Sequence, residues 1–244
     1  MKVALFVPCY VDQFYPHVAI ATLELLERLG CTVEYPAGQT CCGQPMANAG
    51  MEATSLGVMH QFVNRFAGYE YIVTPSGSCA LHVHEHYHAL EQTEEVRDVR
   101  ARVFELSQFL TSVLEVEDLS ARFPHRVGLH ASCHGLRGLR LGASSERPVP
   151  RFDSVRHLLG QVEGLEIVPL SRQDECCGFG GTFAVSEEAI SVRMGNDRIA
   201  DHEAHGAEVI TGTDMSCLMH LEGLLRRQDK PIQVKHIAEI LNAR

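Results

Sequence analysis

Eight of the nine cysteines in this sequence fall into two matched sets. In each set a single cysteine comes first, an adjacent pair followed by glycine comes next, and another single cysteine closes the set. The first set is Cys9, Cys41, Cys42 and Cys79. The second set is Cys133, Cys176, Cys177 and Cys217, and Cys31 belongs to neither. A pattern of this kind that occurs twice indicates an internal repeat.

Each cysteine set has the composition of an iron–sulfur site. Four thiolates match the usual ligand count of a cluster, and adjacent thiolates such as Cys41 and Cys42 can serve different iron atoms. Structural zinc more often takes cysteines spaced as Cys-x-x-Cys or wider. The glycine after each pair, Gly43 or Gly178, lets the backbone approach inorganic sulfide and donate N–H groups to it. The spacing therefore favours one or two iron–sulfur clusters of the 4Fe-4S type and leaves zinc as the alternative.

Other interpretations of these residues explain less of the pattern. Burial as a small hydrophobic side chain suits Cys31 but not eight cysteines in two matched sets. A redox-active dithiol normally has Cys-x-x-Cys spacing rather than an adjacent pair. The glycine-rich residues 178–181 resemble a phosphate-binding loop, but no Walker lysine follows them. Metal or cluster binding is the best explanation of both sets.

The composition is that of a globular protein with an excess of acidic residues. The 244 residues are 45% hydrophobic and carry a formal net charge of −10, which argues against nucleic acid or an anionic membrane as the main partner. No stretch reaches the about 20 apolar residues that a membrane-spanning helix needs. We therefore expect a cytoplasmic protein without a membrane span, where a reducing environment favours metal-binding cysteines over structural disulfides.

The first half alternates predicted strands and helices. Short apolar runs rich in β-branched residues predict strands over residues 3–7, 31–35 and 69–74. Helical spacing of apolar residues predicts helices over residues 13–29, 46–66 and 94–114. Such units imply a parallel sheet with right-handed crossovers. Each cysteine of the first set then lies just after the carboxyl end of a strand, the edge at which open α/β sheets bind ligands.

The second half repeats this order. Strands are predicted over residues 126–131, 165–170 and 208–211, helices over 154–162 and 186–203, and a strand with a short helix over 232–242. Residues 75–79 and 212–217 are predicted as the loops that hold Cys79 and Cys217, and residues 142–151, with two prolines, as a surface loop. The fold class predicted is α/β, with two tandem Rossmann-like parallel-sheet domains, residues 1–120 and 121–244, related by a pseudo-twofold repeat.

The motifs around the cysteines carry a family resemblance. The double pattern is similar to the cysteine-rich domain of heterodisulfide reductase, and it most closely resembles the lactate-utilization protein A family. The residues that carry this closer resemblance are Cys41-Cys42-Gly43-Gln44-Pro45, Gly77-Ser78-Cys79, residues 176–183, Ser216-Cys217-Leu218 and residues 235–239. The resemblance implies an iron–sulfur electron-transfer component of a lactate oxidation complex that works with two other subunits to convert L-lactate to pyruvate.

The sequence departs from the heterodisulfide reductase pattern at one position in each half. There each set ends in Cys-x-x-Cys and supplies five thiolates, whereas here the last positions are His82 and His220, which become possible additional ligands. The missing fifth cysteine disfavours noncubane clusters and disulfide cleavage. A component of a heterodisulfide or thiol reductase is therefore a less favoured further alternative. A zinc-binding or metal-stabilised assembly component without a redox role is another. No flavin or nicotinamide fingerprint is complete, so we expect the chain to act only as part of a complex.

Several histidines lie close to the cysteine sets. His82, His84, His86 and His88 form pairs at helical spacing that either bind a metal or line a solvated helix face. His130 and His134 flank Cys133. They either donate hydrogen bonds to cluster sulfur or, for His130, follow the alternation of the strand.

Overall fold

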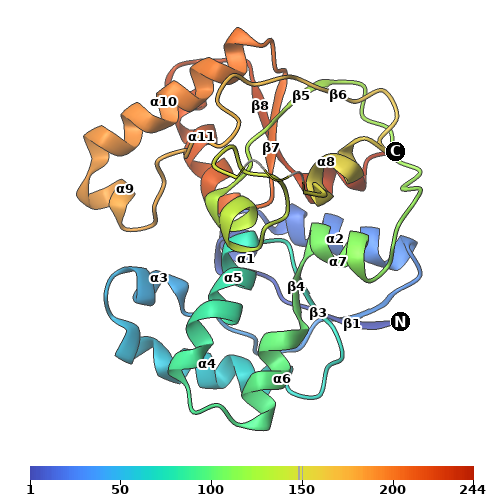
Figure 1. Cartoon of the computed structure of the whole chain (residues 1–244), viewed down its shortest axis with the longest axis vertical. Coiled ribbons are helices and arrows are strands. Elements are labelled where there is room, and N and C mark those ends of the chain that lie inside the picture. Colours follow the sequence, from blue (N-terminus) through green and yellow to red (C-terminus); the bar gives the residue numbers. More distant parts are fainter. Residues whose placement is uncertain (148, 150) are drawn as a thin grey trace.

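The computed structural model, shown in Figure 1, describes residues 1–147, 149 and 151–244. It contains two four-stranded sheets with the same strand order, β2-β1-β3-β4 and β6-β5-β7-β8, and every pairing in them is parallel. The first sheet comprises β1 (Lys2–Leu5), β2 (Thr32–Glu34), β3 (Ile72–Thr74) and β4 (Val103–Glu105). The second comprises β5 (Arg126–Leu129), β6 (Glu166–Ile167), β7 (Val209–Gly212) and β8 (Gln233–His236). The predicted α/β class with two parallel sheets is confirmed.

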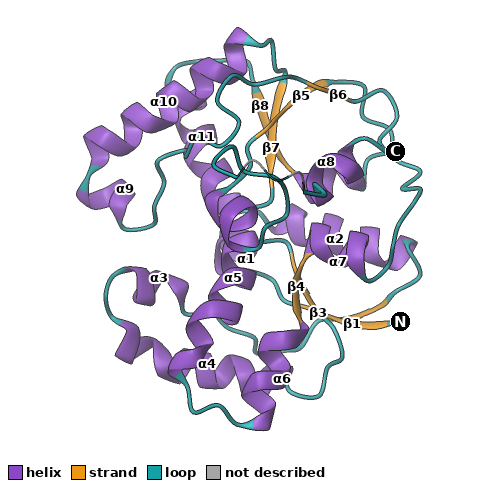
Figure 2. Cartoon of the chain, in the orientation of Figure 1, coloured by secondary structure: helices purple, strands orange, loops and turns teal. Residues whose placement is uncertain are grey.

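Helices connect the strands and cover both sheets, as Figure 2 shows. In the first half they are α1 (Cys9–Phe14), α2 (Pro16–Arg28), α3 (Gln44–Asn48), α4 (Glu52–Phe66), α5 (Gly77–His86), α6 (Glu94–Arg102) and α7 (Leu106–Ser112). In the second half they are α8 (Ser154–Leu159), α9 (Phe183–Ser186), α10 (Glu188–Ala204), α11 (Met215–Arg227) and α12 (Ile237–Leu241). No helix among the described residues combines the length and apolar character needed to cross a membrane.

The helix predicted over residues 94–114 is interrupted by a strand, so this prediction is wrong in its middle. β4 occupies three residues there and pairs with β3, Val103 with Ile72 and Phe104 with Val73. Three residues are too few to show a period of two, and the pairing partner lies about 30 residues away in the sequence, so tertiary structure overrides the local pattern.

The loops predicted over residues 75–79 and 212–217 are shorter than expected. α5 begins at Gly77 and α11 at Met215, so Cys79 and Cys217 each lie in the first turn of a helix. Ser76 caps α5, and its side chain accepts a hydrogen bond from the Cys79 N–H. In the predicted loop over residues 142–151, residues 142–147 form neither helix nor strand, and residues 148 and 150 lie outside the described residues.

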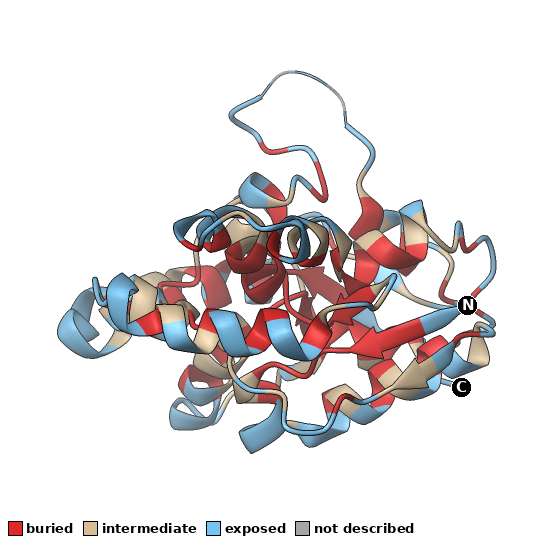
Figure 3. Ribbon diagram, turned by 90° about the horizontal axis from the view of Figure 1, so that it is seen from below, coloured by how far each residue is buried: buried red, intermediate tan, exposed pale blue. Residues whose placement is uncertain are grey.

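The two halves share a hydrophobic core. One buried cluster contains Leu25 and Val73 from the first half together with Val127 and Ile240 from the second. Helix α2 packs against α12, and α7 packs against α8. In Figure 3 the strands are buried inside, while the outer faces of the helices are exposed. The domain boundary at residues 120 and 121 stays a prediction, because the sheets are separate but the core is continuous.

Glu105 gives the fold a pH-dependent stability. Its carboxylate, fully buried at the end of β4, caps α7 by accepting the Gln108 N–H at 3.1 Å. Burial raises the pKa of Glu105 to about 8. The folded state therefore binds this proton more tightly than the unfolded state.

We expect the contribution of Glu105 to the free energy of unfolding to fall as pH rises from about 4.5 to about 8, by at most about 1.4 kcal/mol per pH unit. Glu105→Gln keeps an oxygen acceptor and removes the proton, so this part of the pH dependence should disappear in urea unfolding curves. The exposed Glu91→Gln should leave the pH dependence unchanged. An identical pH dependence in Glu105→Gln and the native protein would contradict the assignment.

Candidate metal centre

The first cysteine set comes together at the carboxyl edge of the first sheet. Cys9 begins α1, shortly after β1, and Cys79 lies in the first turn of α5, after β3. The pair Cys41 and Cys42 lies in the loop after β2. The Cys9 and Cys41 sulfurs are 3.7 Å apart, and the Cys42 and Cys79 sulfurs are 3.5 Å apart. Three strand ends therefore bring four thiols to one place.

The second set has the same arrangement. Cys133 follows β5, and Cys217 lies in the first turn of α11. All four cysteines of the set line one cavity, and the Cys177 and Cys217 sulfurs lie within 4.8 Å of each other. The structure thus gathers all eight predicted cysteines into two groups of four. Cys31 is buried directly before β2, whose first residue Thr32 pairs with Lys2 at the start of β1, so it lies at the amino edge of the first sheet, opposite the edge that holds the first group.

The glycine after each pair supports one cysteine sulfur. The Gly43 N–H donates to the Cys41 sulfur at 3.4 Å, and the Gly178 N–H donates to the Cys176 sulfur at 3.3 Å. Both glycines have left-handed backbone, with φ of 95° and 87°. This conformation is what aims each N–H at the sulfur two residues earlier.

These contacts make the thiols of each set unequal. Hydrogen bonds from Cys42 and Cys9, with the Gly43 N–H, hold the pKa of Cys41 well below its ordinary value. Hydrogen bonds from Cys133 and Cys177 do the same for the pKa of Cys176. One thiolate per site is therefore stabilised by the protein itself.

A single cavity of about 470 Å³ lies between the two sites. Seven of the eight cysteines line it, all except Cys41. Its other lining residues include Asn48, at the end of α3, and Val185 of α9, two helices that lie on the same side of the molecule in Figure 1. The sequence predicts two sites but not that they face one cavity, because cysteine spacing carries no information on how the two sheets are oriented.

A buried carboxylate fixes the two sites relative to each other. Asp214 Oδ1 accepts hydrogen bonds from the Ser76 hydroxyl and from the Ser78 N–H, both at 2.9 Å. Its Oδ2 accepts one from the Ser132 hydroxyl at 2.6 Å. Ser76 and Asp214 also form an antiparallel bridge between the halves. Asp214 therefore ties together the segments that carry Cys79, Cys133 and Cys217.

His82 and His220, the two possible additional ligands, have different surroundings. His82 is buried, neither ring nitrogen has a hydrogen-bond partner within the described part of the chain, and Nε2 would be 3.7 Å from a Cβ built on Gly43. Burial lowers the pKa of His82 to about 4. His220 Nε2 instead lies 3.3 Å from the Ser191 carbonyl oxygen. The role of either residue as a ligand stays a prediction.

The other histidines that the sequence analysis singled out differ in their positions. His82 and His86 stack at 4.8 Å on α5, so this predicted pair is present. His88 lies beyond the end of α5, where its ring contacts the Glu85 carbonyl group, so the second predicted pair is not formed on that helix. His134 lines the shared cavity.

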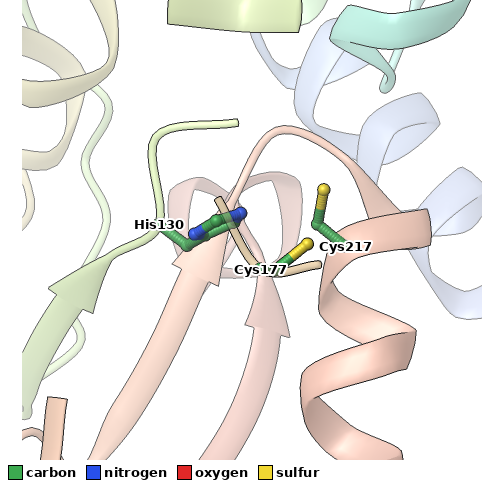
Figure 4. Close-up of side chains that lie close together, drawn as sticks. All are labelled: His130, Cys177 and Cys217. Atoms are coloured by element: carbon green, nitrogen blue, oxygen red, sulfur yellow. The ribbon is translucent and has the colours of Figure 1, made fainter. Parts of the chain in front are cut away.

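His130 is a histidine in direct reach of a cysteine set. A ring nitrogen of His130 and the sulfurs of Cys177 and Cys217 all lie within 4.8 Å of one another. Figure 4 shows these three side chains close together. The residue is 1% exposed, and burial lowers its pKa to about 3, so the ring is neutral. The sequence singled out His130 only by its nearness to Cys133, and a ligand role for it was not predicted.

The donor set fits a polynuclear iron–sulfur group. Each site offers four thiols, and a backbone N–H already points at one sulfur of each pair. The adjoining cavity, about 470 Å³, far exceeds the about 10–15 Å³ that one water molecule needs by the same measure, so there is room for a group larger than one ion. Closed tetrahedral zinc sites do not require such space.

The fold and the site define a protein of duplicated parallel α/β architecture with one four-cysteine site in each half. A family model described as "Cysteine-rich domain" matches residues 3–84 and 127–222, which include all eight of these cysteines. The match covers both sheets except for the strands β4 and β8 and the first residues of β1 and β5, Lys2 and Arg126.

Curated relatives extend the similarity over the whole chain. "Lactate utilization protein A" of Geobacillus thermodenitrificans is 46% identical and that of Geobacillus kaustophilus 45% identical, each over 100% of both chains. The protein of the same name from an Exiguobacterium species is 44% identical over 99% of this chain and 97% of its own. The chain therefore belongs to the lactate utilization protein A family of cysteine-rich domain proteins. A solved glutamate racemase from Bacillus anthracis aligns with 99% of this chain and 78% of its own at a TM-score of 0.37 and 9% identity, which is too low to support an argument.

Replacing Gly178 should damage the second site. A Cβ at this position would lie 2.6 Å from the Ser191 carbonyl oxygen and 2.7 Å from Met194 Cβ, and φ is positive. We expect Gly178→Ala to lower the free energy of unfolding by about 1–3 kcal/mol and to lower metal content.

Gly223 in α11 provides the matched control. A Cβ there meets nothing within 4 Å, so Gly223→Ala should raise the free energy of unfolding by about 0.5–1 kcal/mol. Urea unfolding measures both variants. Equal stability of the two alanine variants would contradict the close packing assigned to the Gly178 turn.

Proposed function

We propose that this protein is the iron–sulfur electron-transfer component of a lactate oxidation complex that converts L-lactate to pyruvate. The observation that carries the proposal is the meeting of two four-cysteine groups at one cavity. The substrate comes from the relatives, whose name is "Lactate utilization protein A". Two other subunits of the complex would bind lactate and accept the electrons.

Four residues from each half would hold one 4Fe-4S cluster. The first cluster would take Cys9, Cys41, Cys42 and Cys79, and the second Cys133, Cys176, Cys177 and Cys217. Such a group supplies one-electron redox chemistry when bound. Gly43 and Gly178 would donate N–H hydrogen bonds to thiolate sulfur and so stabilise negative charge at each site.

Oxidation of one lactate to pyruvate releases two electrons and two protons. A relay with two one-electron sites matches that number, with electrons arriving from the lactate-binding subunit and leaving to the redox group of the other. We place the protein in the cytoplasm in this proposal, because nine free cysteines suit a reducing compartment.

A second candidate function is metal-stabilised assembly without electron transfer. The grouping of His130 with Cys177 and Cys217 favours it, because a mixed imidazole and thiolate set is typical of structural zinc. In this case the metal would hold the second half in the shape that its partners bind.

Cys176→Ser separates the two functions. Electron relay predicts at least about a tenfold loss of lactate-dependent acceptor reduction by the reconstituted complex, with the complex still assembled. Cys31→Ser is the matched control, because Cys31 is also a free cysteine but lies at the amino edge of the first sheet and belongs to neither set. Size-exclusion chromatography reports assembly.

Two results would contradict the relay. One is native electron flow in assembled Cys176→Ser complex. The other is a loss of activity that follows entirely from loss of assembly, which would support the assembly function instead.

A further inference from the structure

The two halves carry different buried side chains at equivalent positions next to the cysteine pairs. Helices α4 and α10 are equivalent, because Ser55 and Ser191 pack against the glycine of each Cys-Cys-Gly turn. Seven residues further along, α4 carries Phe62 and α10 carries Arg198. After another turn, α4 carries Phe66 and α10 carries His202.

The segments after β1 and β5 also carry an aromatic side chain in the first half and a polar one in the second. Phe6 comes three residues before Cys9, and His130 comes three residues before Cys133. All six side chains are at most 1% exposed. A buried aromatic trio in the first half is thus replaced by a buried polar trio in the second.

The aromatic trio forms an apolar cluster with Cys42 and Cys79 of the first site. Phe6 packs edge-on against Phe62 at 4.8 Å and against Phe66 at 5.6 Å, measured between ring centroids. Phe62 also packs against Tyr87, whose hydroxyl donates to the Cys42 carbonyl oxygen at 2.9 Å. The trio and the tyrosine bring no charge to this layer.

The polar trio contains a fully buried guanidinium. Arg198 donates to the carbonyl oxygen of Leu129 at 3.1 Å and to that of Arg172 at 2.5 Å. Burial lowers the pKa of Arg198, while the charges of Asp201, Glu175 and Cys177 oppose that shift. An arginine side chain stays protonated in such surroundings. Leu129 directly precedes His130, whose ring nitrogen lies within 4.8 Å of the Cys177 and Cys217 sulfurs, so this positive charge lies beside the second site.

The negative partners of Arg198 only partly offset its charge at the site. Asp201 pairs with it at 3.3 Å, but Asp201 lies one turn further along α10 from the glycine turn and also accepts the N–H groups of Ser171 and Arg172. Glu175 directly precedes Cys176 in the sequence and forms its own ion pair with Arg172 at 2.9 Å, in contact with solvent. A Cβ built on Gly195 would lie 3.2 Å from the Cys177 carbonyl oxygen, and Arg198 follows one turn later on the same face of α10, the face that contacts the cysteine pair.

We propose that Arg198 makes the second cysteine site the stronger electron acceptor of the two, and thereby sets the direction of electron flow from the first site to the second. This inference rests on the proposed iron–sulfur function. A positive charge held in a poorly solvated layer stabilises the reduced form of a centre, which carries one more negative charge. One electron then leaves the first site, which is oxidised, and enters the second, which is reduced, with no change in protons or covalent bonds.

The test is a redox titration of the iron-loaded full chain, followed by electron paramagnetic resonance. Each site is observed alone after the other is disabled, by Cys42→Ser with Cys79→Ser or by Cys177→Ser with Cys217→Ser. The second site should have the higher midpoint potential. This comparison uses unsubstituted Arg198 and so does not depend on whether an arginine variant folds.

Substitution of Arg198 then tests the cause. Arg198→Leu should move the midpoint potential of the second site to more negative values and leave that of the first site unchanged. Arg198→Lys keeps the positive charge and should retain most of the native potential. Phe62→Leu, at the equivalent position of the first half, exchanges one apolar side chain for another and should move neither potential.

The possible failures are distinguishable. Absence of iron and acid-labile sulfide in the native chain would overturn the proposed function and this inference with it. Clusters in both sites, with the second potential equal to or below the first, or unmoved by Arg198→Leu, would overturn this inference alone.

Discussion

The architecture depends on one carboxylate that serves the other half of the molecule. Asp214 occupies the N-cap position of α11, yet its side chain accepts the Ser78 N–H in the first turn of α5. Two serine hydroxyls, of Ser76 and Ser132, complete its partners. Hydrogen bonds to a charged group contribute about 1.5–3 kcal/mol each, so the two that Ser76 and Ser78 donate across the halves to this 1% exposed side chain strongly disfavour separation of the halves. The helices that carry Cys79 and Cys217 consequently start side by side.

The shared cavity and the common core are consistent with the contact that Asp214 makes between the halves. Parallel sheets place the ends of their strands at one edge, and each sheet in this protein presents three cysteine-bearing segments there. Joining the two edges through Asp214 turns them toward each other. The packing of α2 on α12 and of α7 on α8 then closes the other side of the molecule with apolar contacts. The cysteine-lined cavity and the apolar helix contacts therefore lie on opposite sides of the contact between the two halves.

The sequence predicts the elements well where the pattern is long and poorly where it is short. The cysteine sets and the two parallel sheets follow from spacing and from buried apolar runs. β4 has only three residues, and the first turns of α5 and α11 begin inside segments rich in glycine and serine, so neither shows a clear period. The shared cavity and the exchange of Phe62 for Arg198 depend on the relative placement of distant segments, which residue spacing does not encode.

The most direct test of the account is the metal content of the native chain purified without oxygen. Two iron–sulfur sites predict iron and acid-labile sulfide in equal amounts, about four of each per filled site. Zinc at about one or two equivalents, with neither iron nor sulfide, would contradict the central claim that these eight thiols hold redox-active clusters.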